Sequence, residues 1–506
     1  MDKVKKLSKK IFRTIGKCVK KIMNIKIFNI SLLIVIAGII GLLVVVKIFS
    51  GVVKGDQVDY PVVFNTKDGD LVLMDKKAKN EDKSIKLSNN DNTDNVKYAN
   101  TTDRFILFKK SDSLHLYDSK HKDSTTKIIS NVYNYYFTPL DKYVIALDKD
   151  SNLYAYKLGS KKDAFKIDKD VSSIIDFNDK YVLYISDNNL YIKVYKEKAD
   201  RRKVSGDFNT NYVNQTKITE DGKKIVYIDK DNNLIVQKMN GKEEKVASNV
   251  TSFNTNKNAS KMYYEASDEV SALYYYDGRS HKIDESIYRV FEADLDNEMI
   301  VYAKLKDGLY SLHYAKGNKD SVVVQKDMDF IYSAMIFKNK SIYYVTDNNE
   351  LRYAQITGNK VKKSKSVIDQ VSISSVKEYK DGVYYVADVD DEGGTLYKST
   401  TAKPRKLDTN VVYANTVVGM DGKKLYYFKN YENKGGDLYV YNGSKSKLID
   451  TDVYSFNYVN KGYLYYIKDY SVTNNSGDLY RYTGKSVKIA TDVKKVTGIN
   501  YIYQNK

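Results

Sequence analysis

The sequence contains very little cysteine, proline or tryptophan. Among its 506 residues are one Cys, three Pro and no Trp. A single cysteine excludes a disulfide-stabilised scaffold and any zinc module built from several cysteines. The absence of tryptophan excludes the repeat families that are defined by a tryptophan in each unit. Proline cannot donate a hydrogen bond to a β-ladder, so its scarcity favours a chain made largely of paired strands.

Positive charge is unevenly distributed along the chain. Residues 1–26 contain ten Lys and Arg and one acidic residue, a net charge of +9, which leaves +10 of the total +19 for the other 480 residues. Apolar residues recur every three or four positions in this segment, which predicts a helix with one apolar stripe. We interpret 1–26 as a cytoplasmic topology signal whose lysines and arginines contact anionic lipid head groups. Docking to a cytoplasmic partner is the alternative, and no nucleic-acid recognition motif is present.

A long uncharged stretch follows the basic segment. Residues 27–46 are twenty residues without a charge, enough for a helix to span the hydrocarbon core of a bilayer. The stretch is longer than the apolar region of a cleaved signal peptide, and no small-x-small cleavage site follows it. We therefore predict a single-pass signal-anchor helix at 27–46 in membrane lipid and a linker at 47–60. The N-terminus is then cytoplasmic and the C-terminal part extracellular.

From residue 62 onward one pattern returns: an aromatic or β-branched strand, a short polar turn, and a second strand that contains a leucine. Several short strands per unit of about 40–45 residues are typical of the blades of a β-propeller. No unit shows a sustained helical period, which excludes a helical solenoid. The eleven leucines follow one another at separations of 36 to 45 residues: Leu71, Leu114, Leu153, Leu190, Leu234, Leu273, Leu309, Leu351, Leu396, Leu438 and Leu479.

The predicted fold class is therefore all-β, an array of about eleven four-stranded β-propeller blades behind one transmembrane helix. A propeller ring typically closes with about 4–8 blades. We accordingly expect two packed propellers, at 61–290 and 291–506, with one oversized ring as the alternative. The final segment, 496–503, has the composition of an additional strand, which would complete the N-terminal blade and cover two sheet edges.

Short motifs in these units resemble known propeller families. The turns TEDGKKIVYI (219–228) and GMDGKKLYYF (419–428) resemble the Asp-Gly-Lys-Lys hairpin of TolB-type repeats. The segments LYISD (183–187) and YYVTD (343–347) resemble YWTD-type blades, with Leu, Tyr or Val in place of the tryptophan. The chain is thus similar to bacterial membrane-anchored YWTD-like and TolB-like propellers. The resemblance implies the fold, and it transfers no functional residue because the matched positions belong to strands and turns.

Two hairpin turns carry closely spaced acidic residues in the order D-x-D-x-N. Oxygen ligands in this order can wrap a hard cation, as at the start of a calcium loop. Neither turn continues to the Gly and the distal Glu that complete such a loop. We therefore interpret both as hairpin turns that need residues tolerant of positive φ, with calcium binding as the alternative. The candidate ligands are Asp148, Asp150, Asn152, Asp229, Asp231 and Asn233.

No catalytic motif is visible in the sequence. The four histidines, His115, His121, His281 and His313, lie in different units, and no nucleophile elbow, zinc-protease motif or P-loop occurs. We therefore expect no enzymatic activity and no cofactor. Tyrosine is abundant, with 48 residues, and its doublets are expected to pack between neighbouring blades. Tyrosines left at the surface would instead offer platforms for sugar rings or peptides.

Together these features predict a non-enzymatic binding protein that is tethered to the membrane. Its propeller would recognise an unknown extracellular protein or a cell-envelope polymer at the face where loops from several blades converge. The alternative is a transmembrane sensor, in which the basic N-terminal helix couples the state of the envelope to a cytoplasmic partner.

Overall fold

The computed structural model describes residues 61–74, 84–89, 96–121, 125–267, 269–379, 381–390, 393–412, 417–418, 424–432, 435–459 and 463–497. The chain forms two compact units, Met1–Gln57 and Val58–Lys506, and every described residue belongs to the second. The predicted basic segment (1–26), membrane helix (27–46) and linker (47–60) lie outside the described residues. Within the described part, no helix is long and apolar enough to cross a membrane.

The described residues form antiparallel sheets, seven of them separate and one a longer sheet of 14 strands. The separate sheets contain β4 (Lys97–Tyr98), β5 (Phe105–Lys110), β6 (Ser113–Asp118) and β7 (Thr125–Ile129); β8 (Val132–Phe137), β9 (Tyr143–Asp148), β10 (Leu153–Lys157) and β11 (Phe165–Asp168); β12 (Val171–Phe177), β13 (Tyr181–Ser186), β14 (Asn189–Val194) and β15 (Arg202–Ser205); β16 (Lys217–Ile218), β17 (Lys224–Ile228), β18 (Leu234–Lys238) and β19 (Glu243–Ala247); β20 (Val250–Thr255), β21 (Met262–Ser267), β22 (Ser271–Tyr276) and β23 (Ser280–Glu285); β24 (Ile287–Asp294), β25 (Met299–Lys306), β26 (Leu309–Lys316) and β27 (Val322–Met328); and β28 (Ile331–Phe337), β29 (Ser341–Thr346), β30 (Leu351–Thr357), β31 (Lys360–Val361) and β32 (Lys365–Ile368).

The 14-stranded sheet joins the two ends of the unit. It contains β1 (Val62–Thr66), β2 (Leu71–Met74), β3 (Ser84–Ser88), β33 (Lys377–Tyr379), β34 (Gly382–Asp390), β35 (Gly393–Ser399), β36 (Arg405–Val411), β37 (Val417–Val418), β38 (Leu425–Glu432), β39 (Gly435–Tyr441), β40 (Ser446–Val459), β41 (Tyr463–Ser471), β42 (Ser476–Tyr482) and β43 (Ser486–Thr497). The long strands β40 and β43 each pair with one neighbour through their first half and with another through their second half. The sheet therefore comprises four blades, which with the seven separate sheets gives eleven. Two short 3₁₀ helices, η2 (Thr210–Tyr212) and η3 (Ile373–Ser375), complete the elements.

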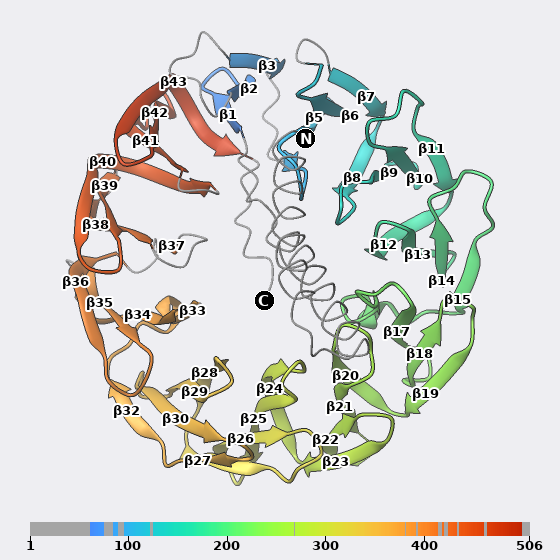
Figure 1. Ribbon diagram of the computed structural model, residues 1–506, viewed down its shortest axis with the longest axis vertical. Helices are drawn as coiled ribbons and strands as arrows, with labels where there is room; N and C mark the ends of the chain where they lie inside the picture. Colours follow the sequence, from blue (N-terminus) through green and yellow to red (C-terminus); the bar gives the residue numbers. More distant parts are fainter. Residues whose placement is uncertain are drawn as a thin grey trace, which may run out of the picture. The chain divides into compact units, whose positions relative to one another are not determined.

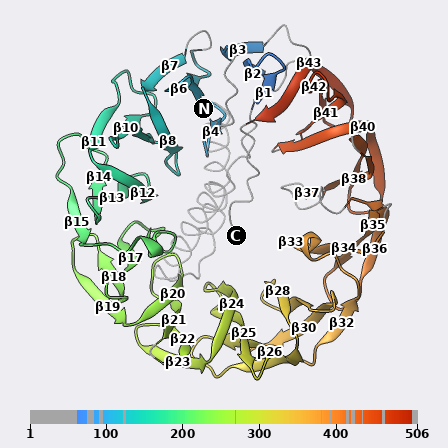
Figure 2. The ribbon, with the colours of Figure 1, turned by 180° about the vertical axis from the view of Figure 1, so that it is seen from behind.

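Within the unit Val58–Lys506 the blades follow one another in chain order around one closed circle (Figures 1 and 2). The circle closes where β43 pairs with β1, with Val496 opposite Phe64 and Lys495 opposite Asn65. The closing residues are 493–497, so the expected closing role is confirmed for Val496 and Thr497, and residues 498–503 of the expected strand lie outside the described residues. The fold is thus a β-propeller-like array. The first strand of each blade lies toward the centre and the last toward the outside (Figure 1).

The structure does not divide the array at the expected boundary between two propellers. Residues 290 and 291 both lie inside strand β24, and Val58–Lys506 is one compact unit. Ile287 of β24 also shares a hydrophobic cluster with Tyr263 and Leu273 of the preceding blade. The division into 61–290 and 291–506 is therefore replaced by a single ring.

The repeating leucines form the core of the blades. Ten of the eleven predicted leucines are at most 1% exposed, in the third strand of their blade. The exception is Leu309, which is 40% exposed, whereas Leu312 of the same strand is fully buried and occupies the core position. Leu309 therefore lies in the predicted strand, but the core position of that strand is three residues later. The hairpin β25–β26 turns at Asp307 and Gly308, so that Lys306 pairs with Leu309.

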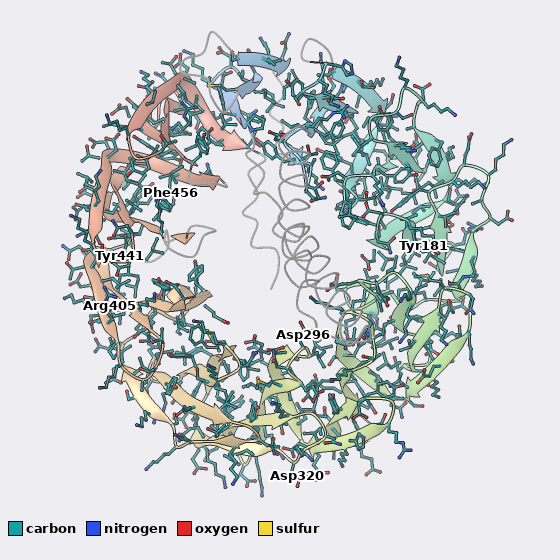
Figure 3. The ribbon with its side chains drawn as sticks, in the orientation of Figure 1. Tyr181, Asp296, Asp320, Arg405, Tyr441 and Phe456 are labelled. Carbon is teal, nitrogen blue, oxygen red and sulfur yellow. The ribbon has the colours of Figure 1, made fainter. Side chains whose placement is uncertain are left out.

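Tyrosines fill the space between neighbouring blades, as the doublets predicted. Tyr263 and Tyr264 are both buried, and they belong to hydrophobic clusters on opposite sides of their blade. The other predicted doublets are also buried. Figure 3 shows side chains filling the gaps between the strands, with Phe456 of β40 in one of them. The ring centroids of Phe456 and Phe428 are 5.0 Å apart.

Four of these seams share a polar contact that we call the Asp–Tyr latch. An aspartate on the outer strand of one blade accepts a hydrogen bond from a buried tyrosine on the second strand of the next, and a lysine or arginine adds an ion pair. At one latch Asp450 accepts from Tyr466 (2.6 Å) and Lys468 (2.7 Å). The four pairs are Asp168–Tyr184, Asp284–Tyr302, Asp408–Tyr427 and Asp450–Tyr466. Each latch gives the hydroxyl of its tyrosine a carboxylate acceptor between two blades.

Candidate binding surface

One face of the ring collects two kinds of connection. In a four-stranded antiparallel blade, the turn between the second and third strands and the link to the next blade lie at the same end. We call this side of the unit Val58–Lys506 the loop face. Hydrogen bonds join its two kinds of connection: the amide of Val171, which starts β12, donates to the carbonyl of Ser151 in the β9–β10 turn at 2.9 Å. Val250 donates in the same way to Asn232 at 2.8 Å.

Exposed apolar side chains are concentrated on the loop face. Among the described residues, twelve large hydrophobic side chains are exposed, and eight of them lie at a hairpin tip or a blade start on this face. These eight are Tyr133, Val270, Tyr288, Leu305, Leu309, Tyr332, Val389 and Val472. Leu140 lies in a turn on the opposite face, and Val323, Leu448 and Val487 lie on outer strands. Three of the eight, Tyr288, Leu305 and Leu309, belong to one blade, and the others are spread over five further blades.

Four aromatic rings form a continuous row on the loop face, which we call the aromatic row. Tyr288 contacts Tyr310 with centroids 4.9 Å apart, Tyr310 contacts Phe330 at 5.3 Å, and Phe330 contacts Tyr332 at 5.3 Å. Successive rings are nearly perpendicular, at 76°, 80° and 70°, the edge-to-face geometry that aromatic pairs prefer. The two ends of the row, Tyr288 and Tyr332, are 48% and 39% exposed.

The row is positioned by two neighbouring blades. Tyr288 is the second residue of β24 and Tyr332 the second residue of β28, so both follow a buried isoleucine that anchors an inner strand. Tyr310 extends from the long β25–β26 hairpin, whose tip also exposes Leu305 and Leu309. Interaction with the neighbouring Tyr288 raises the pKa of Tyr310.

The two D-x-D-x-N turns also lie on the loop face, and their carboxylates bond within the turn. Asp148 Oδ1 accepts from the amides of Asp150 (3.0 Å) and Asn152 (2.7 Å), and its Oδ2 accepts from the side-chain amide of Asn152 (3.0 Å). The second turn repeats this arrangement with Asp229, Asp231 and Asn233. These bonds are typical of an aspartate that stabilises its own turn. In the part of the chain that the structure describes, no group of three or more His, Cys, Asp and Glu side chains is arranged to hold a metal ion.

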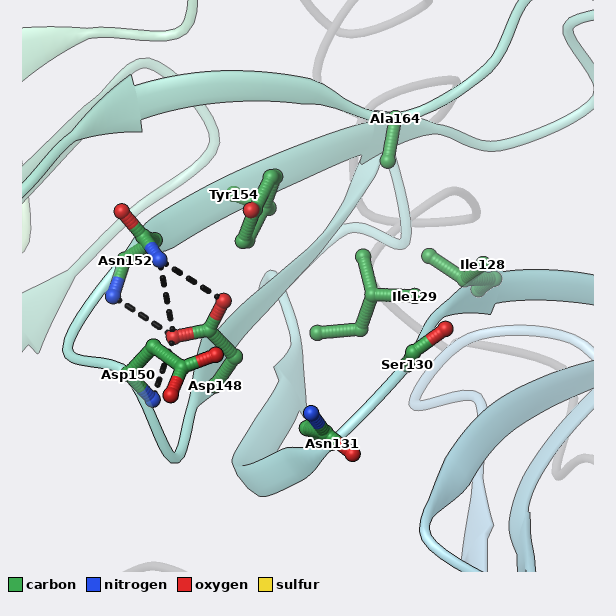
Figure 4. Close-up of a pocket in the computed structure, with 9 residues that line it drawn as sticks. All are labelled: Ile128, Ile129, Ser130, Asn131, Asp148, Asp150, Asn152, Tyr154 and Ala164. Atoms are coloured by element: carbon green, nitrogen blue, oxygen red, sulfur yellow. Dashed lines mark hydrogen bonds between the residues drawn. The ribbon is translucent and has the colours of Figure 1, made fainter.

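A cavity of about 370 Å³ lies beside the first of these turns (Figure 4). One wall comes from the end of β7 and the link that follows it, and the other from the β9–β10 hairpin and Ala164. The lining residues are Ile128, Ile129, Ser130, Asn131, Asp148, Asp150, Asn152, Tyr154 and Ala164. The bonds of Asp148 to its own turn leave the exposed Asp150 as the charged group that a small polar ligand would meet.

His313, His115 and Lys97 each contact other groups of the folded ring. Burial lowers the pKa of His313 to about 4, although Asp284, whose Oδ2 lies 3.7 Å from His313 Nδ1, raises it. His313 Nε2 lies 2.9 Å from Ser311 Oγ, and its ring stacks on Tyr302. His115 lies in a strand beside Phe108, as expected for a strand residue. Burial also lowers the pKa of Lys97 to about 8, and its Nζ donates to the carbonyl of Tyr135 at 2.6 Å.

The sequence pattern did not predict the aromatic row. Tyr288 and Tyr332 follow the same strand pattern as the tyrosines that are buried between blades. The exposed tyrosines share one position in the strand pattern, directly after the first buried residue of an inner strand. At that position Tyr133, Tyr288 and Tyr332 are all exposed.

Comparisons with known proteins give no family for this chain. No protein-family model matches it, and neither does any curated protein. Among solved structures, the tricorn protease is 13% identical over 77% of this chain and 46% of that chain, with a TM-score of 0.31. This chain therefore spans less than half of that protein's length. A eukaryotic initiation factor is 8% identical over 87% of this chain and 98% of that one, with a TM-score of 0.40.

A third structure is KlHsv2 with its loop 6CD replaced by a Gly-Ser linker. It is 11% identical over 54% of this chain and 98% of that chain, with a TM-score of 0.28. The description of this chain as a β-propeller-like array rests on its own order of sheets and on the closure by β43.

Proposed function

We propose that this chain is a non-enzymatic binding protein whose loop face recognises an extracellular protein or a cell-envelope polymer. The observation that carries the proposal is the concentration of eight exposed large hydrophobic side chains on that face. Exposed apolar side chains gathered on one face of a folded domain are typical of recognition sites. The non-enzymatic assignment depends on the lack of catalytic motifs in the sequence, and clear turnover in a glycan-hydrolysis screen would reverse it.

The proposal includes a membrane tether in front of a YWTD-like or TolB-like propeller. The uncharged residues 27–46 and the net charge of +9 before them support a single-pass helix with a cytoplasmic N-terminus. Cys18 is the only cysteine in the chain, so a membrane-impermeant thiol reagent tests the orientation. We expect Cys18 to be labelled only after the cells are permeabilised. Labelling in intact cells would contradict the proposed topology.

The binding role is tested with charges placed on the two faces of the ring. The full-length chain is purified in detergent, immobilised, and incubated with envelope extract from the cells that express it. We expect the Leu305→Asp and Leu309→Asp variants to retain about tenfold less material than the unmodified chain, because each places a charge at an apolar contact. Leu140→Asp changes a more exposed leucine on the opposite face; this variant is the control and should bind normally.

Two results would count against this proposal. Retention of nothing at micromolar concentration would argue against a binding protein, and equal loss with Leu140→Asp would argue against the loop face. The sensor alternative depends on residues 1–26, which lie outside the described residues. Deletion of residues 1–20 distinguishes the two, because a sensor would lose its output whereas a surface binder would keep its affinity.

A further inference from the structure

The aromatic row suggests what the loop face binds. We propose that Tyr288, Tyr310, Phe330 and Tyr332 form a platform for the sugar rings of an uncharged polysaccharide. This inference rests on the proposed binding function and narrows its ligand to one chemical class. It follows from three properties of the row: the packing of its rings, the charges around it and its size.

The packing of the rings favours a flat ligand that lies over them. The centroids of successive rings are separated by 4.9–5.3 Å, and each pair meets edge to face. The rings are therefore in direct contact, and no slot remains between them for a proline or another inserted side chain. Tyr288 and Tyr332 keep part of their surface open at the ends of the row. The apolar C–H face of a sugar can cover such a ring while tyrosine hydroxyls bond to sugar hydroxyls.

The charges around the row favour an uncharged ligand. Seven charged and exposed side chains lie within four positions of the row in sequence: Arg289, Lys306, Lys326, Glu285, Asp307, Asp327 and Asp329. Three are basic and four are acidic, so the local formal charge is −1, although the whole chain carries +19. An anionic wall polymer would be attracted by an excess of basic residues, which this site does not offer.

The size of the site favours a glycan over a folded protein. The row and the adjoining hairpin tip offer Tyr288, Leu305, Leu309, Tyr310, Phe330 and Tyr332. A stable protein interface uses about 20–30 residues on each side. Six side chains, with exposed fractions below one half, are few for such an interface. They are suited to a ligand that binds by stacking a few rings.

The test measures binding of neutral glycans to the full-length chain in detergent. Affinity electrophoresis uses gels containing hydroxyethylcellulose, laminarin or mannan, and calorimetry uses chitin oligosaccharides. A gel containing poly(glycerol phosphate) provides the anionic comparison. We expect at least one neutral probe to bind, and binding to change less than twofold between low and physiological salt because no ion pairs form. Tyr288→Ala and Tyr332→Ala should each weaken that binding about tenfold, whereas Tyr332→Phe should stay within about threefold.

The chain supplies a matched control for these variants. Tyr133 occupies the same strand position in β8 as Tyr332 does in β28, and it is more exposed, at 69%, but it lies outside the row. Tyr133→Ala should leave glycan binding unchanged, and all variants should keep the denaturation midpoint of the unmodified chain.

Three results would overturn the inference: no neutral probe binds, Tyr133→Ala weakens binding as much as Tyr288→Ala, or only the anionic polymer binds. A protein ligand that still depends on Leu305 and Leu309 would then leave the binding function intact while refuting the glycan.

Discussion

The Asp–Tyr latch shows how single residues hold neighbouring blades together. Asp450 lies on β40 of one blade, and Tyr466 and Lys468 lie on the second strand of the next. Burial raises the pKa of the Asp450 carboxyl, but hydrogen bonds from Lys468 and Tyr466 lower it by more, so the net shift is downward. A carboxylate with a lowered pKa stabilises the folded state above its unfolded pKa of about 3.9, and this contribution is lost as pH falls below that value.

Removal of one latch charge should therefore destabilise the ring at neutral pH. We expect Asp450→Asn to lower the free energy of unfolding by about 1.5–3 kcal/mol, because a charge-assisted bond is lost and Lys468 stays half-buried without its partner. The difference from the unmodified chain should shrink as the pH is lowered toward 3. Urea denaturation at pH 7 and pH 3.5 measures both effects. Asp452→Asn changes an exposed carboxyl two residues away and should have little effect; an equal loss there would refute the latch.

At the scale of the element, the blade pattern was predictable, whereas the buried position of the β25–β26 hairpin was not. All eleven leucines lie in the third strand of their blade, as the repeat pattern predicts. Ten of them are core residues, because a third strand needs one large apolar residue against the neighbouring blade. In the segment LYSLHYA, both Leu309 and Leu312 fit that pattern, and only the Asp307–Gly308 turn decides between them. Asp-Gly favours the positive φ angles that a two-residue hairpin turn requires, and here they are 53° and 81°.

The exposure of the aromatic row was unpredictable for a related reason. Tyr288 and Tyr332 carry the same residue type in the same kind of strand as the buried tyrosines. Whether such a ring is covered depends on the neighbouring hairpin, which is distant in the sequence. The D-x-D-x-N turns were predictable as turns because their bonds are local.

The two leucines of this hairpin give a paired prediction. We expect Leu312→Ala to destabilise the chain by about 2–5 kcal/mol, because it removes a fully buried side chain and leaves a cavity. Leu309→Ala removes the same atoms from an exposed tip and should change the free energy of unfolding by at most about 0.5 kcal/mol. Denaturant titration of both variants under the same conditions decides the register. Equal losses would mean that Leu309 is also a core residue.

At the scale of the whole unit, the number of rings is a property that no single blade contains. Each repeat specifies its own four strands and its apolar faces, but ring closure depends on how all eleven blades pack. The sequence therefore predicted the blades and the closing strand while placing a boundary at 290 that falls inside β24. The pairing of β1 with β43 shows that closure is achieved once, between the two ends of the array.

If this closure stabilises the entire ring, one charge at the joint should open it. Val493 of β43 is fully buried in a cluster with Val62 and Phe64 of β1, so Val493→Asp places an unpaired carboxylate between the first and last strands. We expect a loss of about 3–5 kcal/mol, faster hydrogen exchange in β1 and β43, and aggregation through the two exposed edges. Lys494→Asp, at the adjacent and partly exposed position, should retain the closed ring. If exchange in β1 is as slow in Val493→Asp as in the unmodified chain, the joint does not hold the ring closed, and each blade is stabilised by its neighbours alone.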